Sequence, residues 1–202
     1  MRRLLLGFAI SLALYSLILG QEVADTENSQ EFPFSEGGSL RLQLASGDYT
    51  VRAGRGDHVL VRWRIEHAEH QKDMKKIKVH TTVSGNIATV RTDGPTKYAL
   101  FIIEVPPRSD LYLRMRAGDV RVSGVEGNKD IRMTAGDLKI DLIPAAYLRV
   151  HASVKFGDLR AGPMAISKDG IGNSFDWSGS GIYILHASLF AGDLTLERER
   201  VQ

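Results

Sequence analysis

Five aspartates recur in one local setting, where their carboxylates could serve as ligands for a metal ion. Each follows a glycine and precedes a strand-like run; the pairs are Gly47-Asp48, Gly118-Asp119, Gly136-Asp137, Gly157-Asp158 and Gly192-Asp193. A row of carboxylates would suit Ca²⁺, which takes several oxygen ligands. The Gly-Gly-x-Gly-x-Asp repeat of calcium-binding β-rolls is absent, however. We therefore assign the pairs to turns, where glycine supplies an otherwise strained backbone angle and aspartate bonds nearby N–H groups.

A second group with chemical potential is the histidine-rich, charged region from His58 to His80. In it, the run Glu66-His67-Ala68-Glu69-His70 places His67 and His70 beside two carboxylates. A catalytic zinc site needs three converging protein ligands, and the His-Glu-x-x-His signature does not occur. We interpret the stretch from residue 66 to 78 as a solvated charged loop. A metal-binding module with His67 and His70 as ligands is an alternative, and we expect no bound cofactor.

Motifs of nucleophilic and dinucleotide-dependent enzymes are absent from the sequence. No Gly-x-Ser-x-Gly occurs, and Gly170-Ile171-Gly172 does not continue into a dinucleotide-binding fingerprint. We therefore predict a protein without catalytic activity. The alternative is a β-helix enzyme that acts on polysaccharides, which would carry its acidic residues on a strand face beside a groove.

Three aromatic residues, Phe175, Trp177 and Tyr183, lie in or beside a glycine-rich segment, residues 170–181. They could form an exposed patch that stacks on sugars or binds a protein. Large aromatic side chains are buried on average, so the same residues could instead fill the core. The segment therefore carries a possible binding patch, with core packing as the competing interpretation.

The elements that would position these residues are short strands in a repeated unit. A run in which apolar and more polar residues alternate leads into a Gly-Asp pair, and a second alternating run follows the pair. In one such run the apolar residues are Leu111, Leu113 and Met115. In the second half of the chain, the glycines of successive Gly-Asp pairs are 18 residues apart (118 to 136), then 21 (136 to 157), then 35 (157 to 192). About 18 residues accommodate two strands and two turns. The longest interval lacks one expected turn, within residues 170–181.

This repeat predicts an all-β fold, and we favour stacked rungs of a β-solenoid or β-helix type. An antiparallel β-meander or a β-sandwich is the alternative. Glycine at the first turn position would suit a two-residue hairpin. Such a hairpin would place Arg116 opposite Arg121, however, and facing like charges are destabilising. Stacked rungs avoid this pair, and each unit would bury its apolar face against the next.

The sequence divides into a leader, a spacer and a single domain. Residues 1–20 combine Arg2 and Arg3 with an apolar run from Leu4 to Leu19, which is typical of a signal peptide and short for a membrane span. Residues 21–31 are polar and acidic, and we expect a flexible spacer. Residues 32–202 form one β-repeat domain, less regular over 32–106 and with the Gly-Asp repeat over 107–202. An uncleaved leader would be its only attachment to a membrane.

Charge and cysteine content exclude several classes of protein. The chain has 26 Lys and Arg against 24 Asp and Glu, and the leader holds two of the arginines, so the remainder is formally neutral. A neutral domain lacks the positive field that nucleic-acid binding requires. The chain contains no cysteine, which excludes disulfides and a lipid-modified cysteine.

These features resemble a known family. The leader, the run Ser46-Gly47-Asp48-Tyr49-Thr50-Val51, the strand ending in Glu104-Val105-Pro106 and the serial Ala-Gly-Asp units are similar to the putative-adhesin, β-strand-repeat family of bacterial envelope proteins, over about residues 38–197. The resemblance implies a stacked β-repeat domain outside the bacterial inner membrane, and it supplies no catalytic residues.

We therefore predict a non-catalytic exported protein that acts as an adhesion-type binding module, scaffold or sensor. Its location would be periplasmic, outer-membrane-associated or extracellular, and its partner an envelope protein or a glycan. Because the outermost rungs of a β-stack expose unpaired backbone groups, edge-to-edge self-association is also expected.

Overall fold

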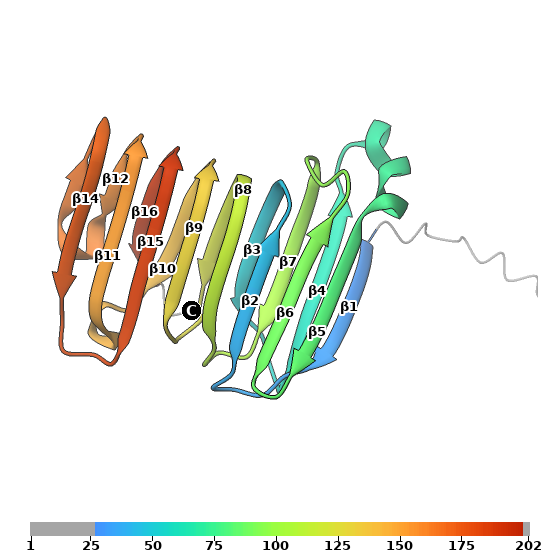
Figure 1. Cartoon of the computed structure of the whole chain (residues 1–202), viewed down its shortest axis with the longest axis horizontal. Coiled ribbons are helices and arrows are strands. Elements are labelled where there is room, and N and C mark those ends of the chain that lie inside the picture. The colour runs from blue at the N-terminus through green and yellow to red at the C-terminus, as the bar shows by residue number, and fades with distance from the viewer. Residues whose placement is uncertain (1–26, 200–202) are drawn as a thin grey trace, which may run out of the picture.

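Strands of alternating buried and exposed residues form two facing β-layers in the computed structural model, which describes residues 27–199 (Figure 1). Layer A contains, in spatial order, β1 (Glu27–Pro33), β4 (His58–Ile65), β7 (Ala99–Val105), β3 (Gly47–Ala53), β8 (Asp110–Ser123), β10 (Leu138–Leu142), β16 (Leu194–Arg198), β12 (Leu159–Ala161) and β13 (Ile166–Lys168). Layer B contains β5 (Lys78–Ser84), β6 (Ile87–Asp93), β2 (Ser39–Leu44), β8, β9 (Lys129–Ala135), β15 (Tyr183–Ala191), β11 (Tyr147–Phe156) and β14 (Ile171–Ser178). The long strand β8 pairs in both layers and joins them.

The central strands of both layers are parallel, and most form units with one strand in each layer. These units are β6–β7, β2–β3, β8, β9–β10, β15–β16 and β11–β12 in spatial order. The all-β prediction is therefore confirmed, and the sandwich alternative fits the two layers. A solenoid is not confirmed, because the units do not follow one another in chain order. The unit β15–β16 lies between β9–β10 and β11–β12 (Figure 1).

Antiparallel strands complete both ends of the stack. At one end β14 pairs with β11 and β13 with β12; at the other, β1 pairs with β4 and β5 with β6. Strands β13 and β14 come from the long interval between Gly157 and Gly192 that lacks a Gly-Asp pair. The chain then turns back and inserts β15 beside β11. The missing turn thus corresponds to a reversal of chain direction at the end of the stack.

The core lies between the layers and is built from the inward-facing residues of every unit. Along β2, Leu40 and Leu42 are fully buried, whereas Arg41 and Gln43 point outward. Alternation of this kind places one set of side chains inside and the other on the outer face. Tyr49 and Phe101 stack inside with ring centroids 4.5 Å apart. Since each unit buries its apolar face against its neighbours, the outer faces are left free to carry polar residues.

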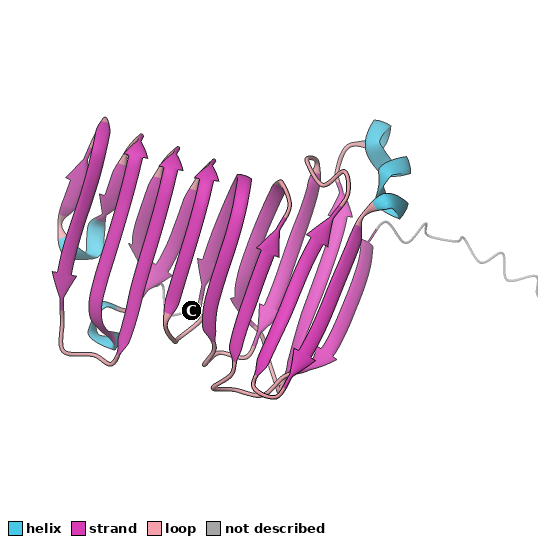
Figure 2. Ribbon diagram, viewed as in Figure 1, coloured by secondary structure: helices cyan, strands magenta, loops and turns pink. Residues whose placement is uncertain are grey.

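Two sequence-based expectations are wrong in detail. Residues 27–31 of the expected spacer form part of β1, because Gln30 and its neighbours pair in register with β4. The expected charged loop contains a 3₁₀-helix, η1 (Ala68–Lys76), which stands at one end of the stack (Figure 2). Two further 3₁₀ turns, η2 (Pro144–Ala146) and η3 (Gly162–Met164), connect strands.

The expected leader and the first residues of the spacer lie outside the described residues. None of the helices within residues 27–199 has the length and apolar composition needed to cross a membrane.

Candidate functional site

The five Gly-Asp pairs stack into one column, which we call the corner column. In spatial order its glycines are Gly47, Gly118, Gly136, Gly192 and Gly157, and each has a positive φ. A Cβ atom on Gly136 would lie 1.9 Å from the carbonyl oxygen of Gly118, and one on Gly192 would lie 1.9 Å from that of Gly136. Such distances are impossible for real atoms, so the close stacking of these corners requires glycine.

The aspartates of the corner column bond to the backbone of the next unit. Oδ1 of Asp119 accepts a hydrogen bond from the Asp137 N–H at 2.9 Å, and Oδ1 of Asp137 accepts one from the Asp193 N–H at 3.1 Å. Oδ1 of Asp193 accepts one from the Asp158 N–H at 3.0 Å. Burial and the neighbouring charge of Asp119 raise the pKa of Asp48. Within residues 27–199 no group of three or more metal-ligating side chains converges.

The three aromatic residues of the possible binding patch do not lie together on the surface. Phe175 faces the core with 7% of its surface exposed. Trp177 and Tyr183 are half-buried and pack against the same core from different strands. The ring of Tyr183 meets that of Tyr147 edge-on, with centroids 6.2 Å apart. Core packing therefore describes these residues better than an exposed patch does.

The histidines of the charged region are held by ring contacts. His70 stacks on Tyr98 with centroids 4.0 Å apart, and His67 meets the same ring edge-on at 5.6 Å. The carboxylates nearest to them are at the limit of an ion pair, 3.8 Å for His67 to Glu69 and 3.9 Å for His70 to Asp73. The two imidazoles are 6.4 Å apart between centroids and nearly perpendicular, and within residues 27–199 they do not belong to a group of three metal-ligating side chains.

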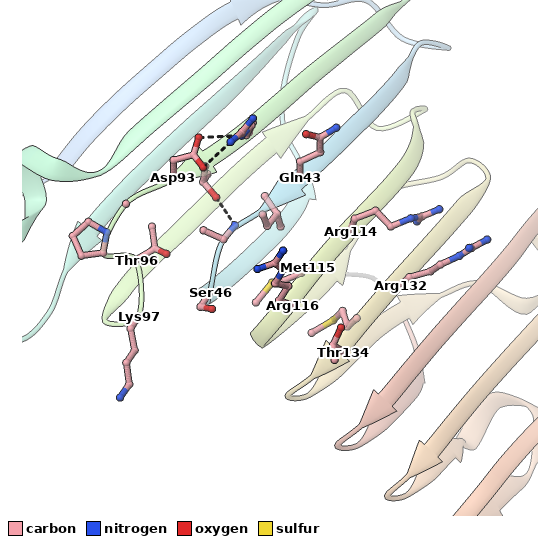
Figure 3. Close-up of a pocket in the computed structure, with 17 residues that line it drawn as sticks. Gln43, Ser46, Asp93, Thr96, Lys97, Arg114, Met115, Arg116, Arg132 and Thr134 are labelled. Carbon is pink, nitrogen blue, oxygen red and sulfur yellow. Dashed lines mark hydrogen bonds and ion pairs between the residues drawn. The ribbon is translucent and has the colours of Figure 1, made fainter.

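A groove that the sequence analysis did not anticipate lies on the outer face of layer B, where β6, β2, β8 and β9 approach the corner column (Figure 3). Its volume is about 850 Å³. Five of the residues that line it are cationic: Arg91, Lys97, Arg114, Arg116 and Arg132. Asp93 is the one acidic residue among those that line it in the described chain. We call this feature the arginine groove.

Strand register places the arginines of the groove. Arg91 lies opposite Gln43, Gln43 opposite Arg114, and Arg114 opposite Arg132. Neighbouring strands are about 4.8 Å apart, so the four side chains form a row across the strands. Arg114 and Arg132 extend side by side in the same direction (Figure 3). The floor beneath them is apolar, because Met115 and Met133 are inward-facing neighbours on the same strands.

The positive charge of the groove is only partly neutralised. Arg91 Nε lies 3.0 Å from Asp93 Oδ2. Asp130, just outside the groove, forms ion pairs with two arginines. Its Oδ2 is 2.9 Å from Arg114 Nη2, and its Oδ1 is 3.3 Å from Arg132 Nε. Burial raises the pKa of Asp130, but the hydrogen bond and charge of Arg114 outweigh burial and hold that pKa below its ordinary value.

Two cations of the groove have no carboxylate partner among residues 27–199. Within the described part of the chain, neither Arg116 nor Lys97 forms an ion pair, although Lys97 Nζ lies 5.2 Å from the Tyr98 ring centroid. The groove therefore presents unneutralised positive charge in a concave surface, which is the chemistry that attracts an anion.

A second hollow, of about 530 Å³, lies over layer A and differs in its charges. Its cations are already paired: Arg62 Nη2 is 2.8 Å from Glu104, and Arg121 Nη2 is 2.7 Å from Asp141. At one end lie carboxylates of the corner column, which are bonded to backbone N–H groups. This hollow therefore has less capacity to bind an anion than the arginine groove.

Comparison with known proteins gives a match of fold. No protein-family model matches the chain, and neither does any curated protein. A crystal structure of a "putative cell adhesion protein" from Clostridium sporogenes superposes with a TM-score of 0.52 at 11% identity, covering 86% of this chain and 100% of that one. The two proteins share a fold.

Two further structures match with lower scores. A "putative adhesin" from Parabacteroides distasonis has a TM-score of 0.30 at 11% identity and covers 84% of this chain and 69% of that one. A "putative adhesin" from Bacteroides fragilis has a TM-score of 0.26 at 10% identity and covers 84% and 96%. The expected resemblance to adhesin-like proteins thus holds at the level of fold for the Clostridium protein, at low sequence identity.

Proposed function

We propose that this protein is a non-catalytic, exported binding module of the adhesion type that recognises an anionic ligand through the arginine groove. The observation that carries the proposal is the set of five cations in one concave surface, two of which have no ion-pair partner in the described part of the chain. The shared fold with a protein described as a "putative cell adhesion protein" is consistent with a binding role.

The register of the groove has an energetic cost that a ligand would offset. Arg114 and Arg132 are directly opposite on parallel strands, and like charges in that position destabilise a sheet. Asp130 compensates for part of that repulsion. Arginine presents a planar fork of donors that matches carboxylate, sulfate and phosphate groups, and hydrogen bonds between ionised groups are stronger than neutral ones. Arg114 already donates from Nη1 to the carbonyl oxygens of Leu113 and Asp130 and from Nη2 to the Asp130 carboxylate, and an anion beside the two side chains would relieve their repulsion by its charge.

The alternative of a polysaccharide-acting enzyme receives less support from this geometry. Hydrolysis of a glycosidic bond uses two carboxyl groups that flank the substrate. In the arginine groove, the lining carboxylate is Asp93, which is paired with Arg91. The aspartates of the corner column accept hydrogen bonds from backbone N–H groups of the adjacent unit. The metal-binding alternative also receives less support, because among residues 27–199 the histidine region does not form a group of three metal-ligating side chains.

Binding to immobilised polyanions tests the proposal. We expect the protein to be retained on polygalacturonate or inorganic polyphosphate, to pass through neutral dextran, and to be released by added salt because salt screens exposed charges. Replacing Arg114, Arg116 and Arg132 together with alanine should weaken retention by roughly tenfold or more.

A matched control removes the same charge from the other layer. Arg52, Arg121 and Arg160 lie on layer A and are each ion-paired there, so their joint replacement with alanine changes net charge equally. This control should retain wild-type binding. Equal loss in both triple variants would show attraction by net charge alone, and that result would refute a role for the groove.

A further inference from the structure

The row of residues that crosses the arginine groove continues well beyond it. One residue per strand faces outward at the same register, and we call this set the outer row. From β6 to β14 it consists of Arg91, Gln43, Arg114, Arg132, Ser188, Ser153 and Ser174. Seven strands at a spacing of about 4.8 Å give the row a length of about 29 Å. The outer row is thus a straight track perpendicular to the strands.

The two halves of the outer row differ in chemistry. The half that crosses the arginine groove is cationic, whereas the half over β15, β11 and β14 carries three serine hydroxyls. A hydroxyl both donates and accepts hydrogen bonds, so it matches the hydroxyl of a sugar. Serine side chains are short, and they leave a shallow, level surface between the taller side chains of the neighbouring rows.

Those neighbouring rows carry ring side chains. On one side, His151 and His186 stack with centroids 5.1 Å apart. Nδ1 of His151 is 2.9 Å from Asp176 Oδ1, and Nδ1 of His186 is 3.6 Å from Asp130 Oδ1, so both imidazoles are oriented by carboxylates. On the other side, Phe190 is 53% exposed. The serine half therefore lies between a row of polar rings and a row that holds an exposed aromatic ring, Phe190, beside the exposed Lys155.

We propose that the ligand is a linear acidic polysaccharide that lies across the strands along the outer row. Its carboxylates contact the arginine half and its hydroxyls contact the serine half. This inference rests on the proposed function, and it adds the class of ligand and the direction in which the ligand lies.

Two observations favour an extended sugar polymer. The cations of the outer row are spread over three strands, β6, β8 and β9, and Arg114 and Arg132 extend side by side (Figure 3), so an elongated ligand can contact them in succession. A polymer charged at every unit, such as polyphosphate or a nucleic acid, would need cations along the whole track. In the serine half the outer row itself has none, and two lysines stand beside it: Lys155 in the row of Phe190, and Lys168, whose Nζ donates a hydrogen bond to the Ser174 carbonyl oxygen. The chain as a whole has a formal net charge of only +2.

Chain length and a distal block test this inference. We expect calorimetry with oligogalacturonides to show affinity that rises with chain length and then levels off once the chain spans the row. Ser153→Tyr places a bulky side chain in the serine half, away from the groove, at a strand position that accepts aromatic residues. It should weaken binding of long oligomers by roughly tenfold and leave short ones unchanged. Thr195→Tyr, on the outer face of layer A, is the matched control and should change neither.

The outcomes separate this inference from the proposed function. Circular dichroism and thermal unfolding of each variant show whether it is folded. If the triple arginine variant loses binding while Ser153→Tyr binds long chains normally, the track is refuted and the anion-binding groove stands. If polyphosphate of equal charge binds as tightly as polygalacturonate, the assignment to a sugar polymer is refuted. If the triple arginine variant binds normally, both proposals are refuted.

Discussion

Replacing Gly136 with alanine is expected to destabilise the domain by more than about 4 kcal/mol, a loss large enough to unfold many domains. The new Cβ atom would lie 1.9 Å from the carbonyl oxygen of Gly118, which is rigid backbone of the adjacent unit. Relief of this contact would require the two units to separate, and separation would disturb the hydrogen bond from the Asp137 N–H to Asp119. Urea unfolding followed by circular dichroism measures the change.

Gly170 provides a matched control for this prediction. Its φ of +101° is close to the +107° of Gly136, but a Cβ atom there would meet nothing within 4 Å. Gly170→Ala therefore carries the backbone strain without the collision, and we expect it to cost about 1 to 3 kcal/mol. Similar losses at the two positions would show that backbone angle alone selects glycine, and the close stacking of the corner column would then be of no consequence.

The stability of the wild-type protein is expected to increase by up to about 3 kcal/mol between pH 8 and 10.5 relative to a Lys129→Met variant. Lys129 is buried at 2% exposure, with Nζ 2.5 Å from the Tyr147 hydroxyl. Burial lowers the pKa of Lys129 to about 8, from an ordinary value of 10.5. Below pH 8 both the folded and the unfolded chain carry the charge, so the full cost of burying it is present. As pH rises, the folded state loses the proton first and that cost disappears.

Urea unfolding of both proteins across this pH range checks the prediction. Burial raises the pKa of Tyr49 and Tyr147, but both proteins contain these tyrosines, so their effect is largely removed in the difference. Parallel stability curves for the two proteins would contradict the assignment of a depressed pKa to Lys129. Methionine has nearly the volume of lysine without its charge, so the variant tests charge burial with little change in packing.

The sequence was sufficient to predict the all-β class, the inward strand residues and the recurrence of the Gly-Asp pairs. These features depend on local alternation and on a repeat that is visible along the chain. The order of the units was not predictable in this way. Strand β15 enters between β9 and β11, which belong to units that are consecutive along the chain, and no local signal marks that insertion. The long interval between Gly157 and Gly192 indicated an irregularity, but it did not indicate a reversal.

The arginine groove was missed because its residues come from strands far apart in the sequence. Arg91 and Arg114 both pair with Gln43 of β2, so the groove brings together the three units β6–β7, β2–β3 and β8. One signal was available: Arg114 and Arg132 are 18 residues apart, the same interval that separates Gly118 from Gly136. Because parallel units stack in register, an outward residue recurring at that interval lies opposite its counterpart. Facing like charges, which disfavour a hairpin between Arg116 and Arg121, thus occur between Arg114 and Arg132 of stacked units.

Arginine side-chain NMR provides the most direct test of the central claim, that the arginine groove is the ligand-binding surface. Spectra of the Nε–Hε groups would be recorded on the folded protein with and without polygalacturonate. We predict that the resonances of Arg114, Arg116 and Arg132 shift on addition of the polymer, whereas those of Arg52, Arg121 and Arg160 on layer A stay in place. Shifts confined to layer A, or no shift at a saturating polymer concentration, would contradict the claim.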